Sequence, residues 1–576
     1  MKRSVWKRFV SVGLIGIMTA GLLAGCGGGG DSQTGAGGDT QAAGGSGSSG
    51  GGGGVTLTAP GTYPIVEGGD LELSMLILSM PNVEDFATND FSLFMEEKTG
   101  IKMEFVTGGR DDMTQKQTML FAGGDYPDII FGTGGDIAKY GVGEGIFIPL
   151  DDYLTEDIVP NYLKLMENYG LDMTREVDGK IYSLATMNEC YHCNYGRKMW
   201  VNTYYLDQIG CEIPTTTEEF KDVCQKFLEF KPDGIAVMGC EKGWFSRMQD
   251  WIMGAYTLVP NASATLGSRD FVLADTSDGS VLCVATTDEY KEGLKFINEL
   301  YEMGAIYDGS FSQTAEVGKT VINQPDEPVL FFTDGTISDM IDSESNNELY
   351  RHYAPMAPIE GPDGTRIAWS SASGGVSSGG VMITDTCENV EAALRWVDFF
   401  YSEFADLYSQ YGSDEGTDWV LAPEGKVGLN DEPALYEVLN AWSSEPQNHD
   451  WQDVGIRVAP ANYRLGQAVE EGVDPYATEG LEKLLYDASV ELYAPYAGNT
   501  TLQNFIELKV SEQEKTDIGT IPTEIEKVIA ERSTAFMMGT QDIDAEWDDY
   551  LAELEAAGLP QLLEFYQMAY DRSQGK

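Results

Sequence analysis

Residues 121–131, Phe121-Ala122-Gly123-Gly124-Asp125-Tyr126-Pro127-Asp128-Ile129-Ile130-Phe131, decide the fold class of this chain. The pair Gly123-Gly124 predicts the end of a helix over Asp112–Ala122, because glycine readily adopts the left-handed conformation of a helix C-cap. The apolar run Ile129–Phe131 then indicates a short buried strand after a turn of polar residues and proline. A helix that leads through a tight turn into a buried strand is typical of an α/β protein.

The segment before this stretch completes an alternating pattern of strands and helices. Leu71–Ser79 indicates a buried strand, Asp90–Thr99 a helix closed by Gly100, and Met103–Thr107 a second strand. Strands that alternate with helices predict a parallel sheet with helices on its faces. Because ligands of such sheets bind beyond the carboxyl ends of the strands, Asn82 and Asp136 are candidate ligand-binding residues.

A second α/β region is expected from about Met199 onward. Thr216 and Glu219 fit a capping box at the start of a helix. Further elements are indicated by apolar runs and by helical spacing of apolar residues: strands at Val329–Thr333 and Val381–Thr384, and helices at Asn389–Tyr401, Asp544–Ala556 and Pro560–Tyr570. Trp396 and Trp547 stand at helix-face spacing, which favours a place in the core.

The N-terminal segment has the pattern of a secretory signal. Four basic residues precede an apolar run of about 15 residues, shorter than the ~20 that a membrane-spanning helix needs. Leu23-Ala24-Gly25-Cys26 resembles a bacterial lipobox, which implies that residues 1–25 are a lipoprotein signal peptide and that Cys26 is acylated. Plain secretion with a chance cysteine is the alternative. Residues 26–62 are rich in glycine and are expected to be a flexible tether that holds the body about 30 Å from the membrane.

Composition narrows the class of partner. The chain has 93 acidic and 36 basic residues, a net charge of −57 and a sequence pI near 4.1. Nucleic acid is excluded as a partner, because binding it needs clustered Lys and Arg. A strongly anionic ligand is disfavoured by the same field, so a neutral ligand is the simplest match.

The cysteines do not follow a disulfide framework. Once Cys26 is set aside, the remaining seven are odd in number and irregularly spaced, and we interpret most of them as free, buried thiols. Cys190-Tyr191-His192-Cys193 has the spacing of zinc and redox sites, but no second pair accompanies it. We expect ordinary core or cleft residues here and no metal site, and the sequence leaves open whether the two cysteines pair or bind metal.

Five stretches, in order along the body, carry a resemblance to a known family. They are Phe121–Phe131, Asp178–Leu184, Leu206–Phe220, Ala392–Trp419 and Ala535–Arg572. Together they resemble the extracellular solute-binding lipoproteins of carbohydrate ABC transporters, in the larger Gram-positive, maltose-binding-protein-like branch. Some relatives carry a calcium loop after the helix that begins near Phe220, but Lys231-Pro232-Asp233-Gly234 offers one carboxylate where calcium needs several oxygens. No metal or other cofactor is therefore expected.

The resemblance implies an α/β, two-lobed periplasmic-binding-protein-like fold of type II with extra C-terminal helices. The lobes would be joined by three crossings, near Ala185–Arg197, Ser371–Gly380 and Gly412–Trp419. The first lobe would comprise residues 65–187 and 380–413, and the second lobe residues 190–378 and 418–572. The ligand site would lie in the cleft between the lobes.

Candidate ligand-binding residues follow from the chemistry of sugars, whose apolar faces suit aromatic rings and whose hydroxyl rims suit polar groups. Besides Asn82 and Asp136, they are the aromatic residues at or near the implied crossings: Tyr191, Trp244, Phe245, Trp251, Trp369, Tyr411 and Trp419. A core position suits each tryptophan equally well, because large aromatics are mostly buried.

The function that the resemblance implies is capture of a neutral oligosaccharide and its delivery to the permease subunits of an ABC importer. The protein would be a monomer on the outer face of the cell membrane, held there by its lipid, and not an enzyme. The alternatives are a lipid-anchored glycoside hydrolase, which would need two carboxylates across a cleft, and a ligand sensor or peptide binder on the same fold.

Overall fold

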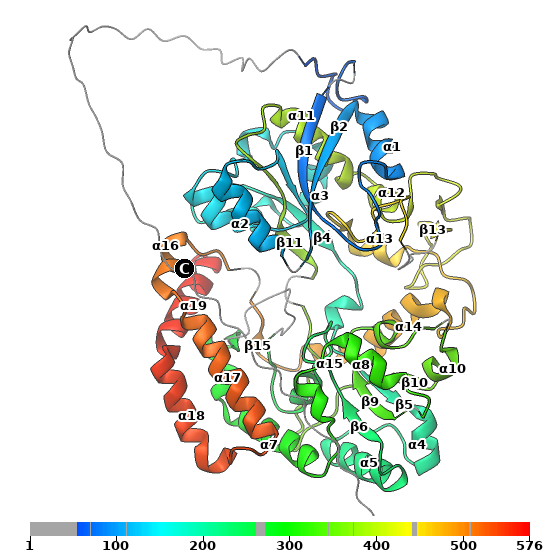
Figure 1. The fold of residues 1–576 in the computed structure, drawn as a ribbon, viewed down its shortest axis with the longest axis vertical. Helices are drawn as coiled ribbons and strands as arrows, with labels where there is room; N and C mark the ends of the chain where they lie inside the picture. Colours follow the sequence, from blue (N-terminus) through cyan, green and yellow to red (C-terminus); the bar gives the residue numbers. More distant parts are fainter. Residues whose placement is uncertain are drawn as a thin grey trace, which may run out of the picture. The chain divides into compact units, whose positions relative to one another are not determined.

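The computed structural model describes residues 55–68, 71–110, 112–260, 271–326, 328–343, 345–371, 374–440, 446–505 and 508–576. From residue 52 onward the chain forms one compact unit. The predicted signal peptide and Cys26 lie outside the described residues. The body contains two main sheets, each covered by helices (Figure 1), which we call the first lobe and the second lobe in chain order.

The first lobe is built on a six-stranded sheet of order β14-β4-β11-β3-β1-β2. Its strands are β1 Leu71–Leu78, β2 Ile101–Gly108, β3 Ile129–Phe131, β4 Leu184–Asn188, β11 Val376–Ile383 and β14 Val458–Ala459. β1 pairs in parallel with both β2 and β3, which confirms the predicted parallel arrangement. The helices α1 Asp90–Thr99, α2 Met113–Gly123, α3 Pro160–Met166, α11 Val390–Asp398 and α12 Ala405–Tyr411 belong to this lobe.

Local sequence accounts for the ends of these helices. The side chain of Asn89 accepts a hydrogen bond from the Phe91 amide at the start of α1, and Gly100 ends α1 with a φ of 69°. Gly124 ends α2 in the same way, with a φ of 71°. Both positions need the left-handed backbone that favours glycine.

The second lobe is built on a four-stranded sheet of order β10-β5-β9-β6. Its strands are β5 Met199–Asn202, β6 Ile235–Met238, β9 Val329–Thr333 and β10 Tyr353–Met356, and a separate sheet contains β7 Val272–Asp275, β8 Ser280–Cys283 and β15 Leu502–Gln503. Its helices are α4 Thr203–Ile209, α5 Thr217–Phe230, α6 Met248–Ile252, α7 Asp288–Glu302, α8 Ala315–Ile322, α9 Ile337–Met340, α10 Asn347–Tyr350, α14 Leu481–Ala488 and α15 Ala494–Ala497.

The predicted capping box at the start of α5 is half formed. The Thr216 side chain accepts from the Glu219 amide at 3.2 Å, as expected. The Glu219 carboxylate, however, accepts from the amide of Thr215 at 2.8 Å rather than from that of Thr216. The helix still begins where the sequence indicates.

The C-terminal helices α17 Ile521–Met537, α18 Ile543–Ala557 and α19 Leu559–Ser573 pack on one another and on α7 of the second lobe (Figure 1). Trp547 on α18 is 6% exposed and Trp396 on α11 is 1% exposed, which confirms both as core residues. Within the described part of the chain, no helix combines the length and the apolar character needed to span a bilayer.

Two crossings between the sheets lie close to where the sequence places them. The chain leaves the first sheet at the end of β4 and enters the second at β5. It returns between β10 and β11.

The third crossing differs from the predicted position at Gly412–Trp419. After α12 the chain forms β12 Trp419–Leu421 and β13 Tyr436–Val438, and then β14, which pairs in parallel with β4 of the first sheet. Trp451 packs on Phe91 with ring centroids 5.0 Å apart, in the core of the first lobe. The chain passes to the second lobe only between α13 Ala461–Leu465 and α14.

Two other predicted boundaries also differ from the structure. Thr58, expected in the tether, accepts through its carbonyl a hydrogen bond of 2.8 Å from the buried side chain of Arg395. The helix α16 Glu512–Ile518, expected in the second lobe, contacts the first-lobe turn Ala138–Gly143. In each case contacts between residues distant in sequence hold the segment against the first lobe.

Candidate ligand-binding site at the lobe crossings

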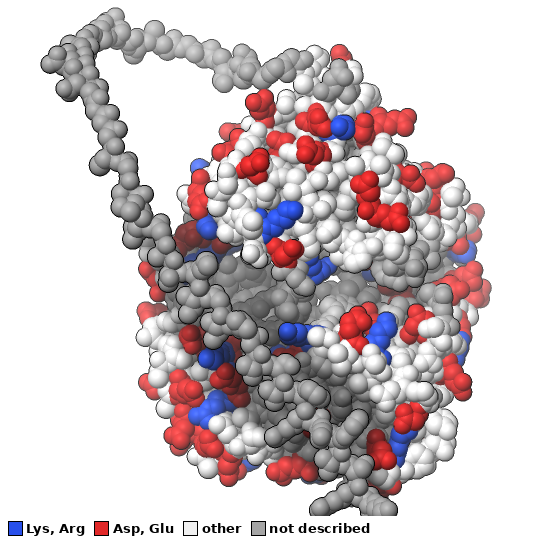
Figure 2. Space-filling view, in the orientation of Figure 1, with Lys and Arg blue, Asp and Glu red and all other residues white. Residues whose placement is uncertain are grey.

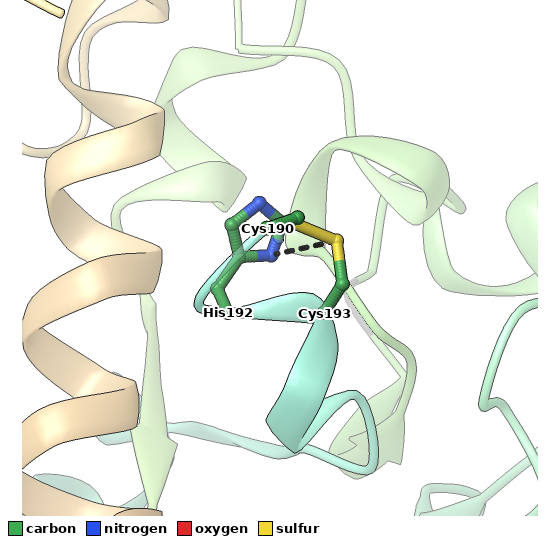
Figure 3. A group of neighbouring side chains, drawn as sticks. All are labelled: Cys190, His192 and Cys193. Carbon is green, nitrogen blue, oxygen red and sulfur yellow. Dashed lines mark hydrogen bonds between the residues drawn. A yellow bond between two sulfur atoms is a disulfide. The ribbon is translucent and has the colours of Figure 1, made fainter. Parts of the chain in front are cut away.

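A short turn at the first crossing is the centre of the candidate site. We call residues 190–196 the crossing turn; it follows β4 and precedes β5. A disulfide joins Cys190 and Cys193 (Figure 3). The amides of Cys193 and Asn194 both donate to the Cys190 carbonyl at 3.2 Å. These two cysteines therefore pair, whereas the other described cysteines, Cys211, Cys224, Cys240, Cys283 and Cys387, are thiols as expected for most of the set.

Lys198 holds the backbone of the crossing turn through two hydrogen bonds. Its ammonium donates to the carbonyls of His192 at 2.9 Å and of Tyr195 at 2.8 Å, and the residue is fully buried. Burial lowers the pKa of Lys198 to about 7, against the opposing effect of nearby Asp334. A buried donor that satisfies two carbonyls makes the turn costly to rearrange.

His192 connects the crossing turn to α14. Its Nε2 lies 3.4 Å from a carboxylate oxygen of Glu482, which also lies 3.6 Å from the guanidinium of Arg464 on α13. Burial lowers the pKa of His192 more than Glu482 raises it. The chain Arg464–Glu482–His192 thus joins a first-lobe helix, a second-lobe helix and the crossing turn.

Aromatic rings line one side of the turn. The ring of Tyr191 lies 5.5 Å from that of Tyr195 and 5.1 Å from that of Tyr486 on α14. All three side chains are partly exposed. They offer the flat apolar surface that a sugar ring or another aromatic group can cover.

Three of the predicted aromatic residues form a second group beside His192. Trp244 lies edge-on to His192 at 6.4 Å, Phe245 lies 5.3 Å from Trp244, and Trp369 lies 5.0 Å from Phe245. Phe245 has a φ of 54°, an uncommon value for a residue with a bulky side chain. The structure therefore brings together Trp244, Phe245 and Trp369 from two separate stretches of sequence; Trp244 is partly exposed, whereas Phe245 and Trp369 are 9% and 7% exposed.

A polar recess lies at the second crossing, where Ala368 and Ser370, the sequence neighbours of Trp369, form part of its lining. It has a volume of about 240 Å³ and is lined by Ser370, Ser371, Asn504 and residues 500–503 among others. Asn504 donates to the carbonyl of Ser370 at 3.5 Å. The hydroxyl and amide groups of this lining are of the kind that bind sugar hydroxyls.

Two of the predicted tryptophans lie in cores instead. Trp251 is 5% exposed and packs on Phe220 of the second lobe at 6.2 Å. Trp419 is 2% exposed, packs on Tyr408 at 5.0 Å and donates its indole N–H to the Gly412 carbonyl at 3.2 Å. Trp251 nevertheless lines a small pocket of the second lobe together with Trp369.

The two polar candidates from the strand ends are engaged within the protein. Asn82 is 7% exposed, and its amide donates to the side chain of Gln452. Asp136 forms an ion pair of 2.5 Å with Lys515 of α16. The strand-end rule places both residues at the correct edge of the sheet but does not reveal these distant partners.

Tyr411 stands beside a charged group that sequence reasoning did not single out. Arg457 binds the carboxylate of Asp406 through two hydrogen bonds of 2.9 and 3.0 Å, and it also donates to Gln410 at 2.9 Å. Burial raises the pKa of Tyr411, against the opposing effect of Arg457 and Arg464. These residues bring the first lobe's polar side chains toward the crossing turn.

The sequence analysis also missed Glu482 and Tyr486, and one local pattern could have indicated them. They stand four residues apart on the same helix, so that both project from one face of α14. No spacing relates them to the crossing turn, which lies almost 300 residues earlier in the chain.

Comparison with known proteins identifies the family. Residues 80–405 match the family model of the bacterial extracellular solute-binding proteins. The chain belongs to this family. The family is extracellular by description, and the resemblance seen in the sequence is thereby confirmed.

Three relatives show how far the likeness extends. FusA of Streptococcus pneumoniae serotype 4 (strain ATCC BAA-334 / TIGR4), a fructooligosaccharide ABC transporter substrate-binding protein, is 25% identical over 496 residues, which cover 83% of this chain and 86% of FusA. YtcQ of Bacillus subtilis (strain 168), a polygalacturonan/rhamnogalacturonan-binding protein, is 23% identical over 444 residues, which cover 74% of this chain and 77% of YtcQ. A solute-binding protein from Bifidobacterium longum infantis ATCC 15697, associated with an HMO-binding ABC transporter, has a TM-score of 0.69 at 19% identity, covering 87% of this chain and 98% of that one.

The structure of a FusA EF-hand mutant in complex with fructo-nystose gives the same fold. Its TM-score is 0.69 at 20% identity, covering 88% of this chain and 99% of that chain. The two-lobed α/β fold of a solute-binding protein is therefore confirmed for this chain. By name, FusA and the HMO-associated protein belong to ABC transporters, and YtcQ is a binding protein.

Proposed function

We propose that this protein captures an oligosaccharide at the crossing turn and delivers it to the permease subunits of an ABC importer. The observation that carries the proposal is the group of partly exposed rings at the crossing turn, Tyr191, Tyr195 and Tyr486, with the partly exposed Trp244 beside His192 of the same turn. Oligosaccharide ligands in the names of FusA and of the HMO-associated protein support the same class of ligand.

A neutral glycan fits the charges of the site better than an acidic one. Acidic side chains outnumber basic ones across the surface (Figure 2). Three arginines near the crossing turn are already engaged, Arg457 by Asp406, Arg464 by Glu482 and Arg197 by Asp250. Their charge is largely neutralised, so they offer little attraction to a uronate.

We further propose that the mature protein is lipid-anchored through Cys26 on the outer face of the cell membrane and acts as a monomer. The lipobox-like sequence and the glycine-rich segment after it support the anchor. Cys26→Ala should release the protein into the medium or leave the precursor uncut. Unchanged membrane association of a variant from which the signal peptide has been cut would contradict the anchor.

Calorimetric titration against a panel of neutral glycans and a uronate polymer tests the ligand class. We expect at least one neutral oligosaccharide to bind and to be recovered unchanged, because a binding protein does not cleave its ligand. Trp244→Ala and Tyr191→Ala should each weaken that binding by about 1–3 kcal/mol, the cost of losing an aromatic anchor. Phe230→Ala is the matched control, since Phe230 is an aromatic residue at the end of α5 with 52% of its surface exposed.

Two results would overturn this function. The first is binding of the uronate polymer with no measurable binding of any neutral glycan. The second is the appearance of new reducing ends during incubation with an oligosaccharide, which would indicate a glycoside hydrolase.

A further inference from the structure

The crossing turn contains three side chains of the kind that bind soft metal ions. The sulfurs of Cys190 and Cys193 and a ring nitrogen of His192 all lie within 4.8 Å of one another. Figure 3 shows the imidazole beside the disulfide, with Nδ1 facing the Cys193 sulfur at 4.0 Å. Two thiolates and one imidazole form a donor set that suits Zn²⁺ and similar ions.

The second ring nitrogen of His192, Nε2, has a carboxylate partner of the kind that metal-bound histidines usually have. Nε2 lies 3.4 Å from the Glu482 carboxylate, so that Nδ1 is left to face the sulfurs. A carboxylate on the far nitrogen fixes the ring orientation and increases the basicity of the metal-binding nitrogen. Arg464 in turn holds Glu482 at 3.6 Å.

The backbone around these donors is held without the help of the disulfide. Lys198 binds the carbonyls of His192 and Tyr195, and the turn amides bind the Cys190 carbonyl. Cys190 is 1% exposed and His192 is 8% exposed, whereas Cys193 is partly exposed and leaves the donors accessible from one side. Opening the disulfide therefore leaves the three donors close together.

We propose that the crossing turn, once its disulfide is reduced, binds a soft divalent ion through Cys190 Sγ, Cys193 Sγ and His192 Nδ1, with Glu482 as the positioning residue for the imidazole. Reduction takes two electrons and two protons from a dithiol outside the cell, which becomes a disulfide itself. Each cysteine thiol then loses one proton to solvent as its sulfur binds the ion. The disulfide and the metal-bound turn are alternative states of the loop that carries Tyr191.

The test uses the full chain and cobalt ions as the probe. A phosphine reductant is chosen because it opens the disulfide without adding a thiol ligand. The phosphine takes up the oxygen of one water molecule and becomes the phosphine oxide. Co²⁺ is then titrated while the thiolate-to-cobalt charge-transfer band is recorded in the near ultraviolet. We expect one equivalent of Co²⁺ to produce the band in the reduced protein and none in the oxidised protein, and added Zn²⁺ to displace it.

Variants distinguish this site from other thiols in the chain. Cys190→Ser/Cys193→Ser should lose the band, while Cys211→Ser, which removes a partly exposed thiol elsewhere, should retain it. Glu482→Gln keeps all three donors and the disulfide, and it should weaken Co²⁺ binding by about 10–100-fold, the usual effect of losing such a partner. His192→Ala should weaken it at least as much.

The proposal would be overturned by any of three results: no band in the reduced native protein, a full band in the double serine variant, or unchanged Co²⁺ affinity in both Glu482→Gln and His192→Ala. Circular dichroism of each variant establishes that it is folded before the titration. Because no glycan enters this experiment, its outcome is independent of the proposed transport function.

Discussion

The buried carboxyl group of Asp450 influences how the stability of the first lobe depends on pH. Asp450 is 3% exposed, and its carboxylate accepts a hydrogen bond from the Gln447 side chain at 3.0 Å. Burial raises the pKa of Asp450 to about 7, although the neighbouring His449 acts in the opposite direction. The folded state therefore retains a proton that the unfolded chain releases near its ordinary pKa.

We predict that Asp450→Asn makes stability less dependent on pH between about pH 4 and pH 7. A carboxyl group whose pKa is raised by folding stabilises the folded state fully at pH values below its pKa in the unfolded chain. This stabilisation is lost as the pH increases through its pKa in the folded state. In the native protein the effect amounts to at most a few kcal/mol. Urea unfolding across this pH range checks the prediction, with the exposed Asp233→Asn as the control. Equal slopes in native protein and Asp450→Asn would contradict it.

Trp419 and Trp244 differ in burial, which distinguishes a core residue from a candidate ligand-binding residue. Trp419 fills a pocket among Tyr408 and Phe404, whereas Trp244 is partly exposed beside His192. Trp419→Ala should lower the free energy of unfolding by about 3–5 kcal/mol, the usual cost of truncating a buried aromatic residue. Trp244→Ala should lower it much less and act mainly on ligand binding. Denaturant unfolding of both variants would refute this assignment if the order of the two effects were reversed.

At the scale of elements, the segment around α16 connects the C-terminal helices to the first lobe. Lys509 lies 3.1 Å from the carboxylate of Glu176, which is 5% exposed, and it donates to Ser378 at 2.9 Å. Six residues later Lys515 pairs with Asp136, but both of these side chains are more than one-third exposed. The two ion pairs thus differ mainly in burial.

We predict that Lys509→Met lowers the free energy of unfolding by about 3–5 kcal/mol, because it leaves the Glu176 carboxylate buried without a cation. Lys515→Met is the matched control and should cost less than about 1 kcal/mol, since an exposed ion pair contributes little. Unfolding in urea measures both changes. Similar losses for the two variants would show that burial of Glu176 is not what matters.

Elements whose limits depend on local sequence could be predicted closely. α1 and β3 have the predicted bounds, since Asn89, Gly100 and the apolar run Ile129–Phe131 mark them. β14 could not be foreseen, because it has two residues and its partner β4 lies about 270 residues earlier. A strand that short has no periodicity from which to predict it.

The candidate site could be predicted in part for a similar reason. Aromatic residues near a crossing were foreseeable from the family resemblance, and Trp244, Phe245 and Trp369 do lie together. Sequence alone could not separate the partly exposed Trp244 from the buried Trp419, because a buried aromatic residue and an exposed one look alike in sequence. The distance in sequence also concealed the link between His192 and Glu482.

At the scale of the whole molecule, the net charge of −57 opposes the compact state. We predict that sodium chloride raises the melting temperature by several degrees between low salt and about 0.5 M. At that concentration the repulsion between exposed charges reaches only a few ångströms. Chloride is preferred to sulfate, because sulfate also strengthens the burial of apolar surface. Thermal melts that do not change with salt would show that the acidic groups are already too far apart to repel.

The arrangement of the chain also suggests how ligand binding could be signalled to a permease. Two separately packed lobes are joined by three crossings, one of which contains the aromatic and charged residues of the candidate site. Such connections can act as hinges when the lobes move as rigid bodies. A ligand favours the closed state only as far as it binds that state more tightly, so it must contact both lobes.

We therefore predict that a glycan which binds in calorimetry lowers the radius of gyration in small-angle X-ray scattering. The first lobe would contribute contacts around Tyr411, and the second lobe those of Trp244 and Tyr486. Trp244→Ala, titrated until it is saturated, should show a smaller decrease than the native protein, since the ring that stabilises the closed state is missing. Phe230→Ala should behave like the native protein. If the radius of gyration of the native protein does not change at saturation, the ligand binds to one lobe alone, and recognition by a permease cannot depend on closure.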